Sequence, residues 1–182
     1  MACTTSLTAD LINDCTKRPV KGLKAKAWLF NSGSATITKT ANKITNLVKS
    51  GAGTSFTLEG IKDFMNAGFS AAVTENMPTA FIHNFSFESW AATAAEKANL
   101  DKADNIFVVV EKNGSQTEGC FLAYGINTGL WKTAQAKMAN DNNGITKVEF
   151  ATRAGEEDEY SEYVLWLTDY ATTKALLTAT ES

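Results

Sequence analysis

The sequence predicts a mainly β protein: an antiparallel β-sandwich or half-barrel with one flanking α-helix and an extended N-terminal arm. Three observations lead to this fold class. Short segments in which apolar and polar residues alternate recur along the chain, as in strands with one buried face. A single Ala-rich segment has a clear helical pattern. Parallel βαβ units would need a helix between successive strands, so antiparallel strands with one covering helix are the natural packing.

Length and composition place the chain among ordinary globular proteins. It has 182 residues, of which 44% are hydrophobic and 20% are charged. A chain of this size buries a hydrophobic core without disulfides or metal. We expect an arm over residues 1–21 and a single β-rich domain over residues 22–182. Because the arm is poor in core-forming residues, we expect a neighbouring subunit to hold it.

The strand predictions rest on a period of two. In GLKAKAWLFN, residues 22–31, Ala27 and Leu29 share one face while Trp28 and Phe30 share the other. Thr, Ile, Val and aromatic residues are enriched in the later segments. These further strands are predicted at residues 35–41, 44–50, 54–60, 79–90, 105–111, 119–125, 129–139, 145–153 and 162–170. Residues 61–80 are ambiguous, and a loop with a helical turn fits them.

The helix is predicted near residues 89–100, in ESWAATAAEKANLDKAD. Ser89 is a plausible N-cap, and Trp90, Ala94 and Ala98 form a stripe along one side. Two hairpin turns are also predicted, at KNGS and at DNNG. A closing helical turn is predicted at residues 171–179.

The stretch CFLAYGINTGLWKTA, residues 120–134, places two glycines four residues apart after a strand. Such a turn can hold a phosphate. However, Gly125 and Gly129 lack the following Lys-Ser/Thr of a P-loop and the glycine spacing of a dinucleotide loop. We therefore predict that they turn a corner in a sheet, where positive φ or close backbone approach is required.

No set of residues predicts catalysis, cofactor binding or a metal site, and we do not expect an enzyme. His83 is the one histidine, and it shares a strand face with Phe81, Phe85 and Phe87, which predicts a hydrogen-bonded, half-buried side chain. The three cysteines have no zinc-ligand spacing and are expected to be reduced thiols. They are Cys3, Cys15 and Cys120.

The net charge of −3 hides an asymmetry along the chain. Residues 1–50 contain eight basic and two acidic residues, and residues 151–182 contain two basic and seven acidic residues. The two regions can attract each other within one molecule or between stacked neighbours. Two groups of residues are therefore candidates for self-assembly. In the basic region they are Lys17, Arg18, Lys21, Lys24 and Lys26. In the acidic region they are Glu156, Glu157, Asp158 and Glu159, which we call the acid loop.

Other partners are not indicated by the residues. Specific nucleic-acid binding would need a concentrated basic patch. No segment approaches the roughly 20 apolar residues of a transmembrane helix, so no membrane partner is predicted. The start of the chain has no basic region followed by an apolar one, so a secretory signal is not expected.

Taken in order, several segments resemble bacteriophage virion structural proteins of the tail-tube type, found in phages and prophages of gut bacteria. The most distinctive feature is Tyr-Gly-x-x-x-Gly-Leu after a strand, followed by an Asn-Gly hairpin and an acid-rich loop. The segments that carry the resemblance are GLKAKAWLF, FIHNFSFESW, NIFVVVEKNG, CFLAYGINTGL, NDNNGITKVEFATRAGEEDEY and TDYATTKALL.

The resemblance implies a building block without a cofactor. In such families six subunits form a ring whose inner strands make a continuous barrel, and the rings stack into a tube through which DNA passes. The implied partners are copies of this chain and other virion proteins, with DNA passing through the lumen without sequence-specific binding. The implied location is the phage particle, after synthesis in the host cytoplasm.

Two alternatives remain open. A head–tail connector or decoration protein of a phage is also a small β-rich subunit. A soluble β-sandwich that binds carbohydrate or a host surface belongs to another class, and it would use exposed aromatic residues as ligand platforms. The candidates for those platforms are Trp28, Trp131 and Trp166.

Overall fold

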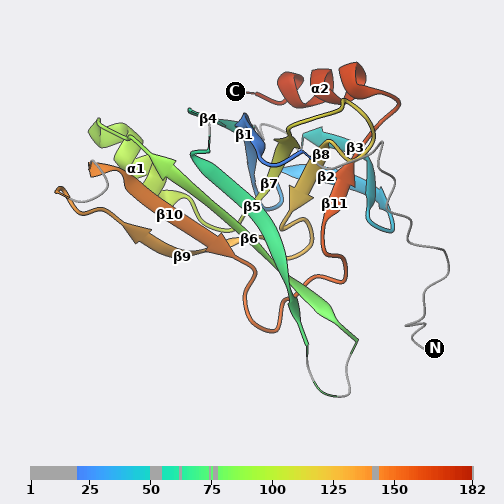
Figure 1. Ribbon diagram of the computed structural model, residues 1–182, viewed down its shortest axis with the longest axis horizontal. Coiled ribbons are helices and arrows are strands. Elements are labelled where there is room, and N and C mark those ends of the chain that lie inside the picture. Colours follow the sequence, from blue (N-terminus) through green and yellow to red (C-terminus); the bar gives the residue numbers. More distant parts are fainter. Residues whose placement is uncertain are drawn as a thin grey trace.

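The computed structural model describes residues 20–49, 55–61, 63–73, 75, 78–140 and 144–181. Apart from its last two residues, the predicted arm lies outside the described residues. In the described part, strands predominate and form two sheets, accompanied by two helices (Figure 1). The predicted class, a mainly β sandwich with a flanking helix, is confirmed.

The larger sheet has seven strands. Their spatial order is β2 (Ala35–Thr40), β3 (Lys43–Lys49), β11 (Tyr163–Leu165), β8 (Phe121–Tyr124), β7 (Ile106–Lys112), β1 (Leu23–Asn31) and β4 (Ser55–Glu59). All neighbours pair antiparallel except β3 and β11, so the sandwich is not antiparallel throughout as predicted. A parallel pair needs a long connection, and the chain between β3 and β11 passes through the entire second sheet.

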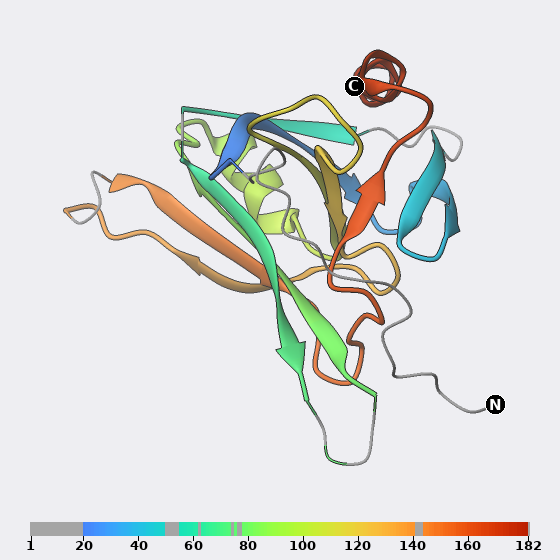
Figure 2. The ribbon, with the colours of Figure 1, turned by 45° about the vertical axis from the view of Figure 1, so that its right-hand side comes forward.

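The smaller sheet has four strands, all antiparallel. Their spatial order is β5 (Met65–Ala72), β6 (Ala80–Ser89), β10 (Thr146–Ala151) and β9 (Trp131–Ala136). The ambiguous segment 61–80 thus holds a strand, and the loop with a helical turn predicted there is wrong. Its Asn, Gly, Ala and Ser residues have weak strand propensity, and pairing with the aromatic β6 decides the outcome. The β5–β6 hairpin extends beyond the rest of the fold (Figures 1 and 2).

Two apolar clusters lie on opposite faces of the seven-stranded sheet. Ala27 and Leu29 of β1 belong to the cluster between the sheets, which includes the inward residues of β6 and β10. Trp28 and Phe30 belong to the cluster on the other face, together with Leu177 of the C-terminal helix. The two faces predicted for residues 22–31 are therefore correct, and both are buried. The central strand β7 is buried along nearly its whole length for the same reason.

Helix α1 (Ala94–Lys102) corresponds to the helix predicted near residues 89–100, but it begins later. Thr93 is its N-cap: the Thr93 hydroxyl accepts from the N–H of Glu96, and the Glu96 carboxylate accepts from the N–H of Thr93. This reciprocal capping box satisfies two donors at the start of the helix, whereas Ser89 ends β6. No residue of α1 is buried, so the predicted stripe does not face the core.

The predicted closing turn is a full helix, α2 (Tyr170–Ala179), so the described part has two helices where one was predicted. Asp169 caps α2 by accepting from the N–H of Thr172. Thr173 and Leu177, one turn apart, are buried against the seven-stranded sheet. Figure 2 shows α2 on the side of that sheet away from β5 and β6.

A buried carboxylate joins α2 to the sheet. Glu111 of β7 is 1% exposed, and it accepts from Lys174 at 2.6 Å, from Lys24 at 2.5 Å and from the Tyr170 hydroxyl at 2.8 Å. Burial acts to raise the pKa of Glu111, but the hydrogen bonds from Lys174, Lys24 and Tyr170 outweigh it and hold that pKa below its usual value. The cluster therefore stabilises the fold while Glu111 is ionised.

We predict that Glu111→Gln lowers the stability near neutral pH by about 1–3 kcal/mol, because charged hydrogen bonds are lost. The folded-state pKa is lowered, so this stabilisation is present above the ordinary glutamate pKa of about 4.3 and is lost as pH falls through the folded-state value. The Tm difference between wild type and variant should accordingly shrink as pH falls below about 4.3.

The matched control is Glu118→Gln, which removes a surface pair with Lys43 and should change Tm little at any pH. Thermal unfolding from pH 3 to pH 7 provides the measurement. A Tm difference for Glu111→Gln that stays constant over this range contradicts the prediction.

Candidate functional site

The four-stranded sheet has an outer face, turned away from the seven-stranded sheet, that is mostly small or polar. Cross-strand pairing places Asn66, Ser86 and Glu149 in one row, and Gly68, Asn84 and Ala151 in the next. The alternate residues of these strands fill the core between the sheets. Strand alternation therefore gives this sheet one polar outer face and one apolar face that is buried in the core.

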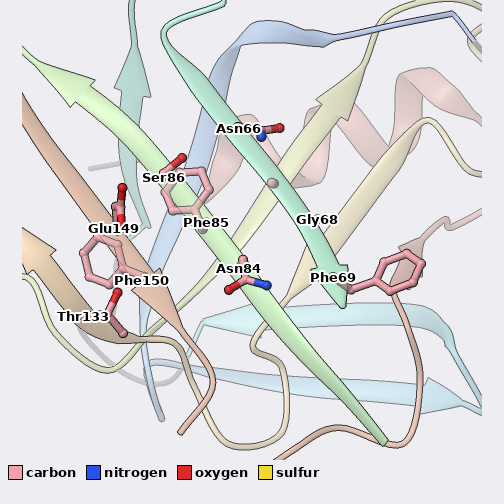
Figure 3. Close-up of a pocket in the computed structure, with 10 residues that line it drawn as sticks. Asn66, Gly68, Phe69, Asn84, Phe85, Ser86, Thr133, Glu149 and Phe150 are labelled. Carbon is pink, nitrogen blue, oxygen red and sulfur yellow. The ribbon is translucent and has the colours of Figure 1, made fainter. Parts of the chain in front are cut away.

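A shallow hollow of about 330 Å³ lies on this outer face, with the strand backbones as its floor. Asn66, Asn84, Ser86, Thr133 and Glu149 contribute polar groups to its lining (Figure 3). Gly68 also lines the hollow. The surface offers hydrogen-bonding groups around a small depression and no apolar cavity.

The open edge of β5, Met65–Ala72, differs from the other sheet edges. Free edges invite pairing with another strand, and charged residues or local caps hinder it. The edge strand β2 carries Lys39, and β4 carries Glu59. On β9, the N–H of Lys132 already donates to Asp104 at 2.9 Å. β5 is eight residues long, has no charge and no proline, and pairs only with β6 in the described part.

Gly68 in the middle of this edge has no explanation within one molecule. Its φ is outside the left-handed region, and a Cβ added there would meet no atom within 4 Å. Glycine inside a strand lowers stability by roughly 0.5–1 kcal/mol relative to alanine. Such a glycine often marks a place where another backbone or a ligand approaches closely.

The basic candidates do not form one free patch. Lys17 and Arg18 lie outside the described residues. Lys21 is exposed. Lys24 pairs with the buried Glu111, and Lys26 pairs with Glu59 at 2.7 Å and Glu181 at 2.8 Å. Lys26–Glu181 is an attraction between the basic front and the acidic tail within one molecule, one of the two arrangements that the sequence left open.

The acid loop is not uniform. Glu156 and Glu159 are exposed, and Glu157 is half-buried with its carboxylate accepting from the N–H of Gly155. Asp158 is 2% exposed, and its backbone forms a bridge with Phe81. The grouping of Asp158 with solvated or partner-facing acids is therefore wrong, because its carboxylate is buried inside the fold.

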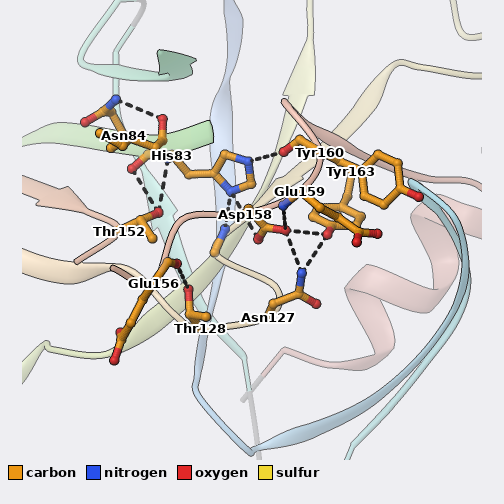
Figure 4. Close-up of polar contacts among 12 residues, drawn as sticks. His83, Asn84, Asn127, Thr128, Thr152, Glu156, Asp158, Glu159, Tyr160 and Tyr163 are labelled. Carbon is orange, nitrogen blue, oxygen red and sulfur yellow. Dashed lines mark hydrogen bonds and ion pairs between the residues drawn. The ribbon is translucent and has the colours of Figure 1, made fainter. Parts of the chain in front are cut away.

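Asp158 belongs to a buried polar cluster around His83 (Figure 4). Its Oδ1 accepts from the Tyr163 hydroxyl at 2.5 Å and from Asn127 Nδ2 at 2.6 Å. The His83 ring lies beside it, with Nδ1 3.8 Å from Asp158 Oδ2. His83 is 0% exposed, so the prediction of a half-buried side chain underestimates its burial. The predicted hydrogen bonding is confirmed, since Nε2 lies 2.9 Å from the Tyr160 carbonyl oxygen.

The two glycines of the 120–134 stretch turn a corner, as predicted. Gly125 has φ 74° and Gly129 has φ 80°, and the N–H of Gly129 donates to the Gly125 carbonyl. A Cβ at Gly125 would lie 2.5 Å from Leu130 Cγ, and one at Gly129 would collide with Asn105. Gly125 also donates its N–H to His83 Nδ1 at 3.1 Å, which ties the corner to the polar cluster.

The remaining sequence candidates are located as follows. Cys120 is a buried free thiol whose pKa is raised by burial, which confirms the expectation for this residue, while Cys3 and Cys15 lie outside the described residues. Among the described residues, no group of three or more His, Cys, Asp and Glu side chains is arranged to hold a metal ion. No helix of the described part is long and apolar enough to cross a bilayer.

Sequence reasoning missed the features that matter most at these surfaces. The open edge follows from pairing between β5 and β6, and only the lack of charge in MNAGFSAA hinted at it. The burial of Asp158 had no local signal, because it stands between two glutamates. Comparison with protein-family models, with curated proteins and with solved structures gives no match.

We predict that Gly125→Ala destabilises the protein more than Gly33→Ala does. Both glycines have positive φ, at 74° and 80°, but a Cβ at Gly33 would meet nothing within 4 Å. Gly33→Ala should therefore cost only the backbone strain of about 1–2 kcal/mol, and Gly125→Ala a further 1–3 kcal/mol or so from overpacking against Leu130. Urea unfolding of the three proteins gives the comparison. Equal losses for the two variants would show that the corner has room for a side chain.

Proposed function

We propose that this chain is a virion structural protein of the tail-tube type, which self-assembles edge to edge into a ring that stacks into a conduit for DNA. The observation that carries the proposal is the open, uncharged edge of β5 on a sheet whose outer face is small and polar. The sequence resemblance to phage tail-tube proteins points in the same direction.

Strand direction favours joining of copies through this sheet. The four strands alternate in direction, so β9 at one edge runs opposite to β5 at the other. A second copy that adds its β9 beside β5 continues the antiparallel alternation, and the Lys132–Asp104 bond occupies only the start of β9 (Trp131–Ala136). Such a contact is heterologous, with different surfaces on the two partners, and it closes into a ring when the rotation between copies permits.

The charges of the outer face suit a channel through which DNA moves. Lys147 is the one lysine or arginine of the paired strands β6 and β10, and it lies 2.9 Å from Glu149. Glu88 is exposed on the same face, opposite Lys147. Affinity for DNA comes largely from Lys and Arg on phosphates. A lining with more acids than bases holds DNA weakly and lets it pass.

The carbohydrate-binding alternative loses support from its proposed platforms. Trp28 is 0% exposed. The Trp131 ring is covered by Arg153, whose guanidinium carbon lies 3.2 Å from the ring centroid. Trp166 is half-buried against the cluster beneath α2. A connector or decoration role requires no such platform, and microscopy of the purified protein distinguishes a tube from these.

The edge is tested by Gly68→Lys. A Cβ at this position meets nothing within 4 Å, so the monomer should fold, while a lysine in the middle of the edge hinders strand addition. We expect rings or tubes from the wild type in negative-stain micrographs and monomers from the variant, measured also by light scattering. Ser86→Lys is the matched control, since it adds the same charge to the same face away from the edge. Assembly of Gly68→Lys at wild-type length would remove the β5 edge from the interface.

The acid loop is tested separately, with Asp158 left intact. We expect that changing Glu156, Glu157 and Glu159 to Gln shortens the polymers and makes their length insensitive to salt. The loop acids would pair with basic residues of a stacked neighbour, and each exposed ion pair is worth only about 0.2–1 kcal/mol. A ring repeats the pair in every subunit, so the sum affects polymer length. Salt weakens these pairs as the Debye length falls to about 3 Å at 1 M. Wild-type length should fall as salt rises. Identical length and salt response in both proteins would mean that the loop is only a solvated surface.

A further inference from the structure

His83 is held in one protonation state by two bonds on opposite sides of its ring. Nδ1 lies 3.1 Å from the N–H of Gly125, which can only donate, so Nδ1 is an acceptor without a proton. Nε2 lies 2.9 Å from the Tyr160 carbonyl oxygen, which can only accept, so Nε2 carries the proton. The side chain is completely buried. The ring is thus the neutral Nε2–H tautomer.

Asp158 beside it is only half satisfied. Its Oδ1 receives hydrogen bonds from Asn127, from Tyr163 and from the N–H of Glu159. Its Oδ2 is buried and has no hydrogen-bond partner in the described part of the protein. A buried acceptor without a donor costs free energy. His83 Nδ1, which accepts from the N–H of Gly125, lies 3.8 Å from this oxygen.

We propose that His83 and Asp158 form a proton-operated switch, in which one proton taken from solvent onto His83 Nδ1 replaces the Gly125 hydrogen bond by an ion pair with Asp158 Oδ2. Protonated Nδ1 is a donor and can no longer accept from Gly125. The same proton gives Oδ2 the donor that it lacks. Closing the gap from 3.8 Å requires a small movement of the ring or of the acid loop. The proposal is independent of the tail-tube function.

The groups around the ring do not compete for this proton. Tyr124 and Tyr163 pack edge-on against His83, with ring centroids at 5.4 and 6.2 Å. Burial first, then Glu162, raises the pKa of Tyr124, and burial first, then Asp158, raises that of Tyr163. Both tyrosines therefore stay protonated on acidification.

The charges nearby act in opposite senses. Negative charge near a histidine ring favours its protonated form, and the acids here are Glu162, which accepts from the Tyr124 hydroxyl, and Glu159, whose N–H donates to Asp158. Lys39, which lies over the Tyr163 ring and bonds Asn127, opposes it. Thr152, on the other side, bonds only the His83 backbone and is neutral.

The switch couples three segments that lie far apart in the sequence. His83 is on β6, Gly125 begins the corner between β8 and β9, and Asp158 lies in the acid loop (Figure 4). Protonation releases the corner and tightens the loop. A proton shifts the balance between two arrangements only by its different affinity for them. Here the two arrangements differ in proton affinity because Nδ1 accepts from Gly125 in one and donates to Asp158 Oδ2 in the other.

The experiment uses the fact that the chain has one histidine. Nitrogen-15 NMR of the protein labelled in histidine follows both ring nitrogens as pH falls from 8 toward 4, and the Gly125 amide signal is followed in the same samples. We expect the Nε2–H tautomer at high pH, protonation of Nδ1 in the folded protein on acidification, and loss of the Gly125 hydrogen bond with the same midpoint. A ring that stays neutral until the protein unfolds, or a ring that titrates while Gly125 is unchanged, overturns the switch.

Two variants test whether Asp158 is the group that pairs with the protonated His83 ring. Asp158→Asn removes the charge that draws the proton, and it should lower the midpoint by about one pH unit or more. Glu156→Gln removes one charge from the same loop at an exposed position, and it should leave the midpoint nearly unchanged. Equal shifts in the two variants would show a general charge effect and no pairing with Oδ2. If Asp158→Asn does not fold, His83→Gln decides instead: its Gly125 amide must lose the pH response, and persistence of that response rules the proposal out.

Discussion

Burial of the seven-stranded sheet on both faces is the constraint on which the rest of the structure depends. Its middle strands must be apolar on both sides, because one face meets the four-stranded sheet and the other meets α2. β7 satisfies this with consecutive buried residues, and β1 satisfies it with Ala27 and Leu29 on one face and Trp28 and Phe30 on the other. The one charged side chain buried in β7, Glu111, is tolerated because two lysines and a tyrosine bond it.

Once the central sheet is enclosed, the four-stranded sheet becomes the layer that meets the surroundings. Its inner residues complete the core, and its outer residues are left small and polar. The sheet is open, so its edge strands β5 and β9 have no further strand partner in the described part of the chain. The proposed ring follows from this arrangement, since an open uncharged edge is costly to leave unpaired in a monomer and useful in an assembly.

The polar cluster at His83 joins the two sheets, since the His83 ring of β6 packs against Tyr124 of β8 and Tyr163 of β11. The β5–β6 hairpin extends past the larger sheet (Figure 1), and the cluster joins its base to the corner at Gly125 and to the acid loop. Hydrogen bonds replace apolar packing at this joint. Such bonds have fixed geometry and respond to protons, whereas an apolar contact would not. A structural joint and a proton switch are therefore compatible uses of the same residues.

The sequence by itself determined the sandwich class, the two faces of residues 22–31, a helix near 89–100 and the corner at Gly125 and Gly129, and the structure moved the start of that helix to Ala94. Each of these features depends on local periodicity or on a backbone conformation that particular residues favour, and residues close together in the sequence are enough to predict either one. Only the tertiary structure decided the strand at 65–72, the parallel pairing of β3 with β11, the extent of α2 and the burial of Asp158. Those outcomes depend on partners distant in the chain: an Asn-, Gly- and Ala-rich segment becomes a strand because β6 pairs with it, and an aspartate among glutamates becomes buried because Asn127 and Tyr163 supply its hydrogen bonds.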